Sequence, residues 1–336
     1  MTVIDVPTLL ARAIHRHMGD GHGLANARRL SGGASRETWA FDVAGPDGTL
    51  PLILRRDPPR AVPLPETTDG TRGIDRITEA MLQKAARAAG VRCADVTFTL
   101  DADDELGDGY VMERIEGETI ARKILRDAEY AAARPILARQ CGEALARIHA
   151  LSGPDLPVLP VRDARTQWSE FRDLLDGFGD PHPTFELAFR WLDRHMPAPA
   201  APRTVHGDFR MGNIIVGPDG LRAVLDWELA HLGDPAEDLG WICVNSWRFG
   251  NHAKPVGGFG DYSQLLDAYE AAGGTPIALE RVKYWQMLGS MKWGIMCMTM
   301  YLSFANGADT SVERAMIGRR TSETEIDLIT LLEAVA

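Results

Sequence analysis

The chain has 336 residues, of which 45% are hydrophobic and 25% charged, and its formal net charge is −11. These proportions are typical of a folded globular protein and disfavour global disorder. The acidic balance disfavours nucleic acid as a partner, because phosphate neutralisation needs a basic face. The length allows one large domain or two of ordinary size.

Compartment signals are few. Four cysteines stand far apart, without a CxxC pair or Cys–His metal spacing, which is typical of a reduced compartment. The N-terminal segment MTVIDVPTLLARAIHRHMG has no uninterrupted apolar run and predicts an amphipathic helix, so we expect no signal peptide and a cytoplasmic protein. The apolar stretch 284–305 contains Gln286 and Lys292, and we expect a buried helix rather than a membrane span. Nothing in the sequence indicates an oligomeric state.

Strand patterns dominate the first part of the chain. Trp39–Val43 and Leu50–Arg56 flank the turn sequence GPDG and predict a hairpin. Val96–Leu100 and Tyr110–Ile115 predict two more strands, joined by an acidic turn, and Ile74–Ala89 predicts a helix between the two pairs. This order indicates a small antiparallel sheet with one helix packed on it. Four prolines in residues 57–73 predict an exposed loop.

Helical patterns dominate after Gly117. The expected helices are Thr119–Leu151, Thr166–Gly177, Pro183–His195, Tyr262–Ala272 and Leu279–Phe304. One isolated hairpin interrupts them, formed by Asn213–Val216 and Leu221–Leu225 around a second GPDG turn. The fold class is therefore α+β, with a mostly-β part followed by a mostly-α part.

The segment HGDFRMGNIIVGPDGLRAVLDWELAHLGDPAEDLGW, residues 206–241, carries the chemistry. Asp208 lies five residues before Asn213, and the hairpin returns the chain so that Asp226 lies near Asn213 at its open end. Carboxylate and amide oxygens suit Mg²⁺, and a further carboxylate can accept a proton from a hydroxyl. Phosphoryl transfer requires this division of roles. As the alternative, each residue is an ordinary turn residue.

The same segment resembles the signature of the aminoglycoside phosphotransferase and choline kinase superfamily, HGDxxxxN followed by D-W/F-E-x-A and GDP-x-x-DL. The closest likeness is to phosphotransferase domains related to those found beside acyl-CoA dehydrogenases. The resemblance implies an ATP-dependent small-molecule kinase in which Asp208 is the base and Asn213 and Asp226 bind Mg²⁺. It implies that Asp234 and Asp238 brace the site. His206 is expected to orient the catalytic loop.

The resemblance also implies a bilobal, protein-kinase-like fold. Residues 1–112 would form a small nucleotide-binding lobe, residues 113–117 a hinge, and residues 118–336 a larger, mostly helical catalytic lobe. At the hinge, backbone groups of Glu113 and Ile115 would bind the adenine edge, with Met112 behind the ring.

Two further segments would contact the ATP phosphates. Ser31, Gly32, Gly33 and Ser35 occupy the place of a phosphate-covering loop, although SGG is also an ordinary turn sequence. Arg55 stands where the family has a lysine, and it keeps the charge on a bulkier, forked group.

Glu79 is the candidate ion-pair partner of Arg55. Its helix, however, has an apolar face at helical spacing (Ile74, Ile77, Met81 and Ala85), and Glu79 points roughly opposite to that face. The alternative is therefore a solvated surface glutamate.

The acceptor region shows no excess of carboxylates. Five acids and five bases lie between Gly240 and Asp309, so a polycationic aminoglycoside is disfavoured. The resemblance points instead to a hydroxyl on an apolar or acyl-type molecule. Two other classes stay open: a nucleotide-binding module without catalysis, and a metal-dependent hydrolase, although the latter lacks a histidine-rich ligand set.

Overall fold

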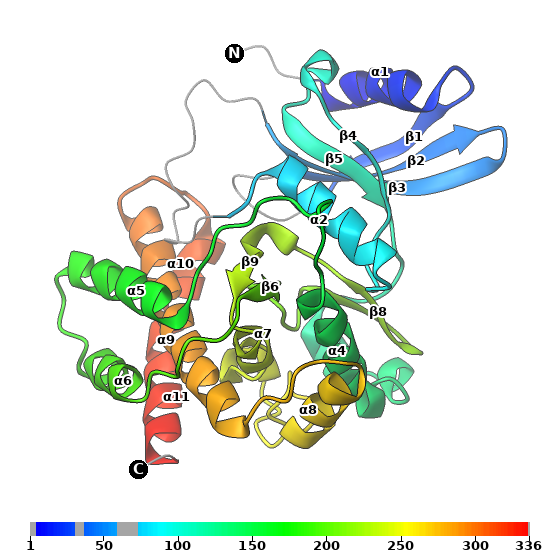
Figure 1. The fold of residues 1–336 in the computed structure, drawn as a ribbon. Coiled ribbons are helices and arrows are strands. Elements are labelled where there is room, and N and C mark those ends of the chain that lie inside the picture. The colour runs from blue at the N-terminus through cyan, green and yellow to red at the C-terminus, as the bar shows by residue number, and fades with distance from the viewer. Residues whose placement is uncertain (1–4, 31–36, 59–72, 335–336) are drawn as a thin grey trace.

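The computed structural model describes residues 5–30, 37–58 and 73–334. The chain forms two lobes (Figure 1), a small lobe built on a sheet and a larger lobe built mainly from helices. The α+β, kinase-like architecture expected from the sequence is therefore confirmed. Most of the proline-containing loop 57–73 lies outside the described residues.

The small lobe contains a five-stranded antiparallel sheet in the order β1-β2-β3-β5-β4. Its strands are β1 (Gly23–Arg29), β2 (Glu37–Gly45), β3 (Gly48–Asp57), β4 (Val96–Thr99) and β5 (Asp108–Glu113). The predicted β2–β3 hairpin and the β4–β5 pair are both present. Strand β1 was not predicted, because its sequence GLANARR is largely polar and none of its side chains is fully buried.

One helix covers each face of this sheet. Helix α1 (Val6–Met18) packs on the face that carries Phe41 and Leu54, and the predicted N-terminal amphipathic helix is thereby confirmed. Helix α2 (Arg76–Ala88) packs on the opposite face, over Ile53. Because side chains alternate along a strand, Arg55 lies on the same face as Ile53, toward α2.

The prediction that α2 packs through the face with Ile77 and Met81 was wrong. Ile77 and Met81 are 36% and 44% exposed, whereas Arg76 and Glu79 are buried. The helix buries Arg76 and Glu79 beside apolar residues such as Leu82, because the sheet presents Arg55 to it and buried charges are stable only when they are paired. The periodicity of one segment cannot predict an ion-pair partner that lies on another element, such as Arg55 on β3.

The large lobe is built from nine helices within the described residues. They are α3 (Ala121–Arg126), α4 (Arg134–His149), α5 (Ala164–Phe178), α6 (Pro183–Arg194), α7 (Ala236–Trp241), α8 (Tyr262–Ala271), α9 (Leu279–Ala305), α10 (Val312–Gly318) and α11 (Thr321–Glu333). The helix expected over Thr119–Leu151 is divided into α3 and α4. Asp127 is extended between them, and Pro135 lies in the first turn of α4, where a missing N–H costs little.

Two short sheets hold the central segment. The predicted hairpin is formed by β7 (Ile214–Gly217) and β8 (Gly220–Val224). A second pair, β6 (Arg203–Val205) and β9 (His231–Gly233), was not predicted. Three residues are too few for a periodic signal, yet this pair closes the loop that follows β6.

Helix α9 passes through the middle of the large lobe, and most of its side chains are buried. Its charged residue Lys292 is buried with its Nζ 3.7 Å from Glu237 Oε1. The expected core helix is therefore confirmed. Among the described helices, none is long and apolar enough to cross a membrane.

Candidate active site

Asp208 follows β6, and three side chains hold its carboxylate. Its Oδ1 accepts hydrogen bonds from Trp241 Nε1 at 2.7 Å and from Arg210 Nε at 2.9 Å. Its Oδ2 accepts a hydrogen bond from Asn213 Nδ2 at 2.5 Å. Three hydrogen-bond donors fix the orientation of this carboxylate.

The turn before Asp208 depends on a glycine. Gly207 has φ +79°, and a Cβ built on it would lie 2.3 Å from the carbonyl oxygen of Leu229. Glycine meets both requirements, a left-handed backbone and a close approach of two chains. The HGD sequence is therefore needed for the loop's shape as well as for its carboxylate.

His206 is fully buried and ties this loop to the end of β8. Its Nδ1 accepts a hydrogen bond from the Asp208 N–H at 3.2 Å, and its Nε2 lies 2.9 Å from the carbonyl oxygen of Leu225. The first contact makes Nδ1 the acceptor, so Nε2 carries the proton and donates to Leu225. These contacts suit the orienting role that the sequence predicts.

Asp238 lies under the same loop. Its two oxygens accept from the backbone N–H groups of His206 at 2.7 Å and Gly207 at 2.9 Å. Its Oδ2 also lies 3.0 Å from His149 Nε2. Burial alone would raise the pKa of Asp238, but the hydrogen bond and charge of His149 hold that pKa below its ordinary range. A buried anion thus fixes the loop from behind.

Asp234 makes a similar set of contacts nearer to α9. Its Oδ2 accepts from Arg281 Nε at 2.7 Å and Trp285 Nε1 at 2.8 Å, and its Oδ1 accepts from the Ala236 N–H at 3.0 Å. The last bond closes a turn just before α7. The hydrogen-bond partners of Asp234 and Asp238 do not include Asp208. Both residues hold neighbouring segments, which fits a bracing role.

Asn213 and Asp226 meet at the open end of the β7–β8 hairpin. The Leu225 N–H donates to the carbonyl oxygen of Asn213 at 2.8 Å, so Asp226 begins beside Asn213. Asp226 has a left-handed backbone, with φ 66° and ψ 64°. The amide oxygen of Asn213 accepts no hydrogen bond from any described residue. One carboxylate and one amide oxygen fit the preference of Mg²⁺ for hard oxygen ligands.

Arg55, on β3 of the small lobe, contacts Asp226 and two neighbouring glutamates. Its Nη2 lies 2.7 Å from Asp226 Oδ1, 3.5 Å from Glu79 Oε1 and 3.6 Å from Glu228 Oε2. Burial alone would lower the pKa of Arg55, but the charges of Glu79 and Asp226 outweigh it and hold that pKa well above its ordinary value. The arginine is therefore a permanent cation at the meeting point of the two lobes.

Sequence reasoning missed a second arginine in this network. Arg76 is buried, ion-paired with Glu79, and donates to Asp57 Oδ2 at 3.2 Å and Glu228 Oε2 at 3.3 Å. Glu79 is fully buried, so the surface alternative for that residue was wrong. Glu228 could have been found, since it is the acid of the DWE motif. The only sequence signal for Arg76 was weak: it lies one helical turn before Glu79.

The residues predicted to form the hinge lie at and just after the end of β5. Met112 is buried, and its sulfur accepts a contact from Gln83 Nε2 at 3.5 Å. The Glu113 N–H already donates to the Asp95 carbonyl oxygen at 2.9 Å. The Ile115 N–H donates to no described residue. The predicted phosphate-loop residues Ser31, Gly32, Gly33 and Ser35 lie outside the described residues.

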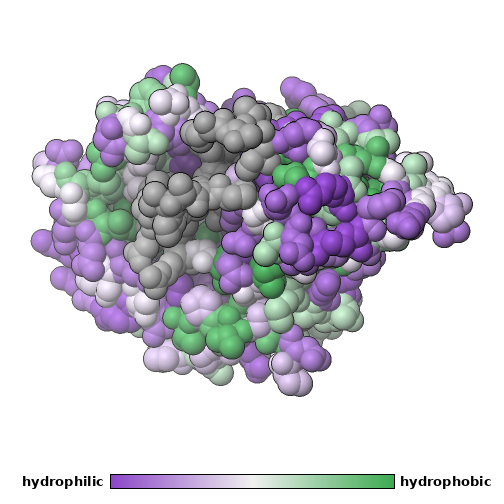
Figure 2. All heavy atoms as spheres, turned by 90° about the horizontal axis from the view of Figure 1, so that it is seen from above, coloured by the Kyte–Doolittle hydropathy of each residue, from purple (hydrophilic) through white to green (hydrophobic). Residues whose placement is uncertain are grey.

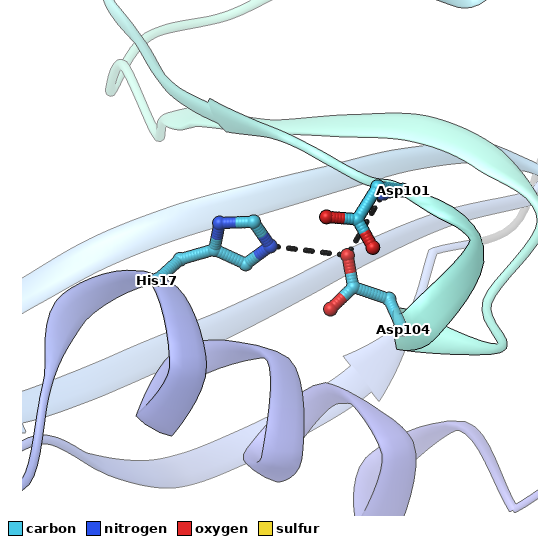
Figure 3. A group of neighbouring side chains, drawn as sticks. All are labelled: His17, Asp101 and Asp104. Carbon is cyan, nitrogen blue, oxygen red and sulfur yellow. Dashed lines mark hydrogen bonds and ion pairs between the residues drawn. The ribbon is translucent and has the colours of Figure 1, made fainter.

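Another acidic group lies in the small lobe, where His17, Asp101 and Asp104 converge (Figure 3). Arg16 pairs with both carboxylates, with its Nη2 2.5 Å from Asp101 and 2.6 Å from Asp104. Viewed from above, strongly hydrophilic side chains gather on the right-hand side of the molecule (Figure 2), the side on which the small lobe lies in Figure 1. These ion pairs tie α1 to the β4–β5 turn.

The fold and the His206–Trp241 segment define the class of the protein as a two-lobed phosphotransferase. The model of the phosphotransferase enzyme family matches residues 26–274, and the chain belongs to that family. Acyl-CoA dehydrogenase family member 11 of Pongo abelii is 26% identical over 355 residues, which cover 97% of this chain and 43% of that protein. The chain thus spans less than half the length of this relative.

Solved structures share the fold. A putative aminoglycoside phosphotransferase from Ralstonia eutropha superposes with a TM-score of 0.71 at 20% identity, over 97% of this chain and 98% of that one. The aminoglycoside phosphotransferase APH(4)-Ia, in a ternary complex with AMP-PNP and hygromycin B, has a TM-score of 0.61 at 15% identity, over 97% and 99%. Family membership and fold together support ATP-dependent phosphoryl transfer to a small molecule.

Proposed function

We propose that the chain transfers the γ-phosphoryl group of Mg-ATP to a hydroxyl of a small molecule, with Asp208 as the base. The observation that carries the proposal is the contact between Asp208 and Asn213 beside Asp226. It joins a proton acceptor to a pair of oxygen ligands in one loop region. Phosphoryl transfer needs both, because catalysis rests mainly on positioning and charge stabilisation.

Asp208 would accept the hydroxyl proton as the acceptor oxygen bonds to the γ-phosphorus. The bond from that phosphorus to the β–γ bridging oxygen breaks, and ADP leaves with that oxygen. Asn213 and Asp226 would hold Mg²⁺, which supplies neutralisation of the phosphate charge when it is bound. Arg55 would bind phosphate oxygens through its fork of N–H donors, and Ile115 would donate its N–H to the adenine.

The acceptor is proposed to be an acyl-type alcohol rather than an aminoglycoside. The acceptor region has balanced charge, whereas a polycation would be bound best by an excess of carboxylates. Relatives that match most of this chain are called acyl-CoA dehydrogenase family members and are more than twice as long as the matching part. That association favours a substrate carrying an acyl group.

A nucleotide-binding module without catalysis is the second candidate. The close pairing of Arg55 with Asp226 favours it, because the phosphate-binding cation and a metal ligand already neutralise one another. The two candidates differ in one result, whether phosphate reaches any acceptor.

The test is ADP release from Mg-ATP, measured for the wild type and Asp208→Asn with a panel of alcohols. The panel contains hydroxyacyl thioesters, hydroxy acids, choline, sugars and aminoglycosides. Asp219→Asn is the matched control, since Asp219 lies at the exposed turn of the same hairpin. We expect stimulation by one acceptor class, lost by about 100-fold or more in Asp208→Asn alone. Mg-ATP binding without stimulation by any acceptor would favour the second candidate.

A further inference from the structure

A row of tryptophans begins at the carboxylate of Asp208. Trp241, at the end of α7, donates to Asp208, and its ring centroid lies 5.3 Å from that of Trp247 in the turn after α7. The ring of Trp247 lies 4.8 Å from that of Trp293 on α9. We call these three residues the indole wall. They come from separate segments, so only the fold brings them together.

Two arginines stack on this wall. The Arg210 guanidinium carbon lies 4.5 Å from the ring centroid of Trp247, and that of Arg320, just before α11, lies 5.6 Å from Trp293. Their side chains are 25% and 30% exposed, whereas the indoles behind them are nearly buried. The wall therefore carries two partly exposed guanidinium groups, each paired with a carboxylate, over buried aromatic rings.

Both arginines keep donors unused. Arg210 bonds Asp208 through Nε and the Met211 carbonyl oxygen through Nη1. Arg320 bonds Glu323 through Nε. The Nη2 groups of both arginines donate to no described residue. A guanidinium stacked on an aromatic ring still offers its N–H edge to a carboxylate or carbonyl oxygen.

The indole wall also contains unpaired donors. The Nε1 atoms of Trp247 and Trp293 are buried and have no hydrogen-bond partner among the described residues. Most buried polar groups in proteins are paired, so each exception calls for an explanation. An oxygen-bearing ligand that enters beside the rings would satisfy such a donor.

We propose that the indole wall, with Arg210 and Arg320, binds the non-reacting part of the acceptor and selects one that carries a carboxylate or acyl carbonyl near its hydroxyl. The inference rests on the proposed function, because the acceptor hydroxyl must lie at Asp208. A cationic acceptor would find the charges of Asp208 and Glu323 already offset by Arg210 and Arg320, so it would gain little by binding there. An anionic or carbonyl oxygen would gain charge-assisted hydrogen bonds.

The experiment compares a matched acceptor pair, a hydroxy acid and the amino alcohol in which the carboxylate is replaced by an aminomethyl group. Initial rates are measured for the wild type, Trp247→Phe and Arg320→Gln. We expect the wild type to prefer the acid. Arg320→Gln should lower kcat/KM for the acid by about tenfold or more and leave the amino alcohol unchanged or improved. The KM for Mg-ATP should not change.

The chain offers a matched control in Arg165 and Trp168. This pair has a similar distance, with the guanidinium carbon 5.4 Å from the ring centroid, but it lies on α5. Trp168→Phe and Arg165→Gln should leave the acid-to-amine preference unchanged. A change in preference that appears equally in these variants would overturn the proposal.

Acceptor binding without turnover separates the inference from the proposed function. With Mg-AMP-PNP present, quenching of tryptophan fluorescence by the hydroxy acid should be lost or weakened in Trp247→Phe. If the wild type transfers phosphate and neither Trp247→Phe nor Arg320→Gln alters its preference for the acid, the acceptor-binding role of the indole wall is wrong and the proposed kinase activity stands. If the wild type binds the hydroxy acid through the indole wall but transfers no phosphate, the proposed kinase activity is wrong and the binding role of the wall stands. Neither binding nor transfer with either acceptor would overturn both.

Discussion

Arg55 Nη2 lies 2.7 Å from Asp226 Oδ1, and this contact joins residues 171 positions apart. It connects β3 of the small lobe to the loop after β8 in the large lobe. Mg-ATP would exchange this ion pair for two new contacts, phosphate on Arg55 and metal on Asp226. The affinity for the nucleotide should therefore depend on how firmly Arg55 is held.

Arg55→Lys tests that dependence. An ammonium keeps the charge but loses the fork that reaches several oxygens, so the KM for ATP should rise by about tenfold, with a smaller change in kcat. Steady-state ADP release at varied ATP measures both constants. Arg56→Lys is the control, because Arg56 bonds Glu37 and the Leu106 carbonyl on the other face of the strand. An unchanged KM in Arg55→Lys would place Arg55 outside the phosphate site.

Arg76→Gln should be strongly destabilising. Its removal leaves the buried carboxylate of Glu79 without its closest partner, which costs about 3–5 kcal/mol of unfolding free energy. Arg12→Gln is the comparison, since the Arg12–Glu105 pair is about 60% exposed on both sides and should contribute about 1 kcal/mol or less. Urea unfolding measures both. If both variants lowered the unfolding free energy by the same amount, the Arg76–Glu79 pair would contribute no more than an exposed ion pair.

Stability should fall at acid pH through Asp238. The pKa of Asp238 is held below its ordinary value of about 3.9, so its anion stabilises the fold above that pH and loses this effect as pH falls toward the lower, folded value. Asp238→Asn should therefore be less stable than the wild type near neutral pH. Urea unfolding between pH 7 and 3 should show the difference shrinking below about pH 4. A difference that stays constant to pH 3 would contradict this assignment.

Gly207→Ala should abolish activity and destabilise the fold. The new Cβ would meet the Leu229 carbonyl oxygen, and the left-handed backbone adds about 1–3 kcal/mol of strain. Gly153→Ala separates the two causes, because Gly153 also has positive φ but has no atom within 4 Å of a Cβ. Thermal unfolding and ADP release of both variants make the comparison. Similar losses in the two variants would rule out the clash as the cause.

The sequence alone predicted the parts of the molecule that depend on neighbouring residues. The two GPDG hairpins follow from turn chemistry and short strands, and Asp208, Asn213 and Asp226 are brought together by a single hairpin within 18 residues. The two-lobed class came from the order of these motifs. The amphipathic pattern of the N-terminal segment predicted helix α1, but not its position on the sheet.

Tertiary structure decided what depends on partners far along the chain. Helix α2 buries two charged residues, Glu79 and Arg76, because Arg55 and Glu228 come from other elements to pair with them. Trp241 became a donor to Asp208 only when α7 packed against the loop after β6. Periodicity measures how one segment separates apolar from polar side chains. It does not register a buried charge whose cost is offset by an opposite charge 150 or more residues away.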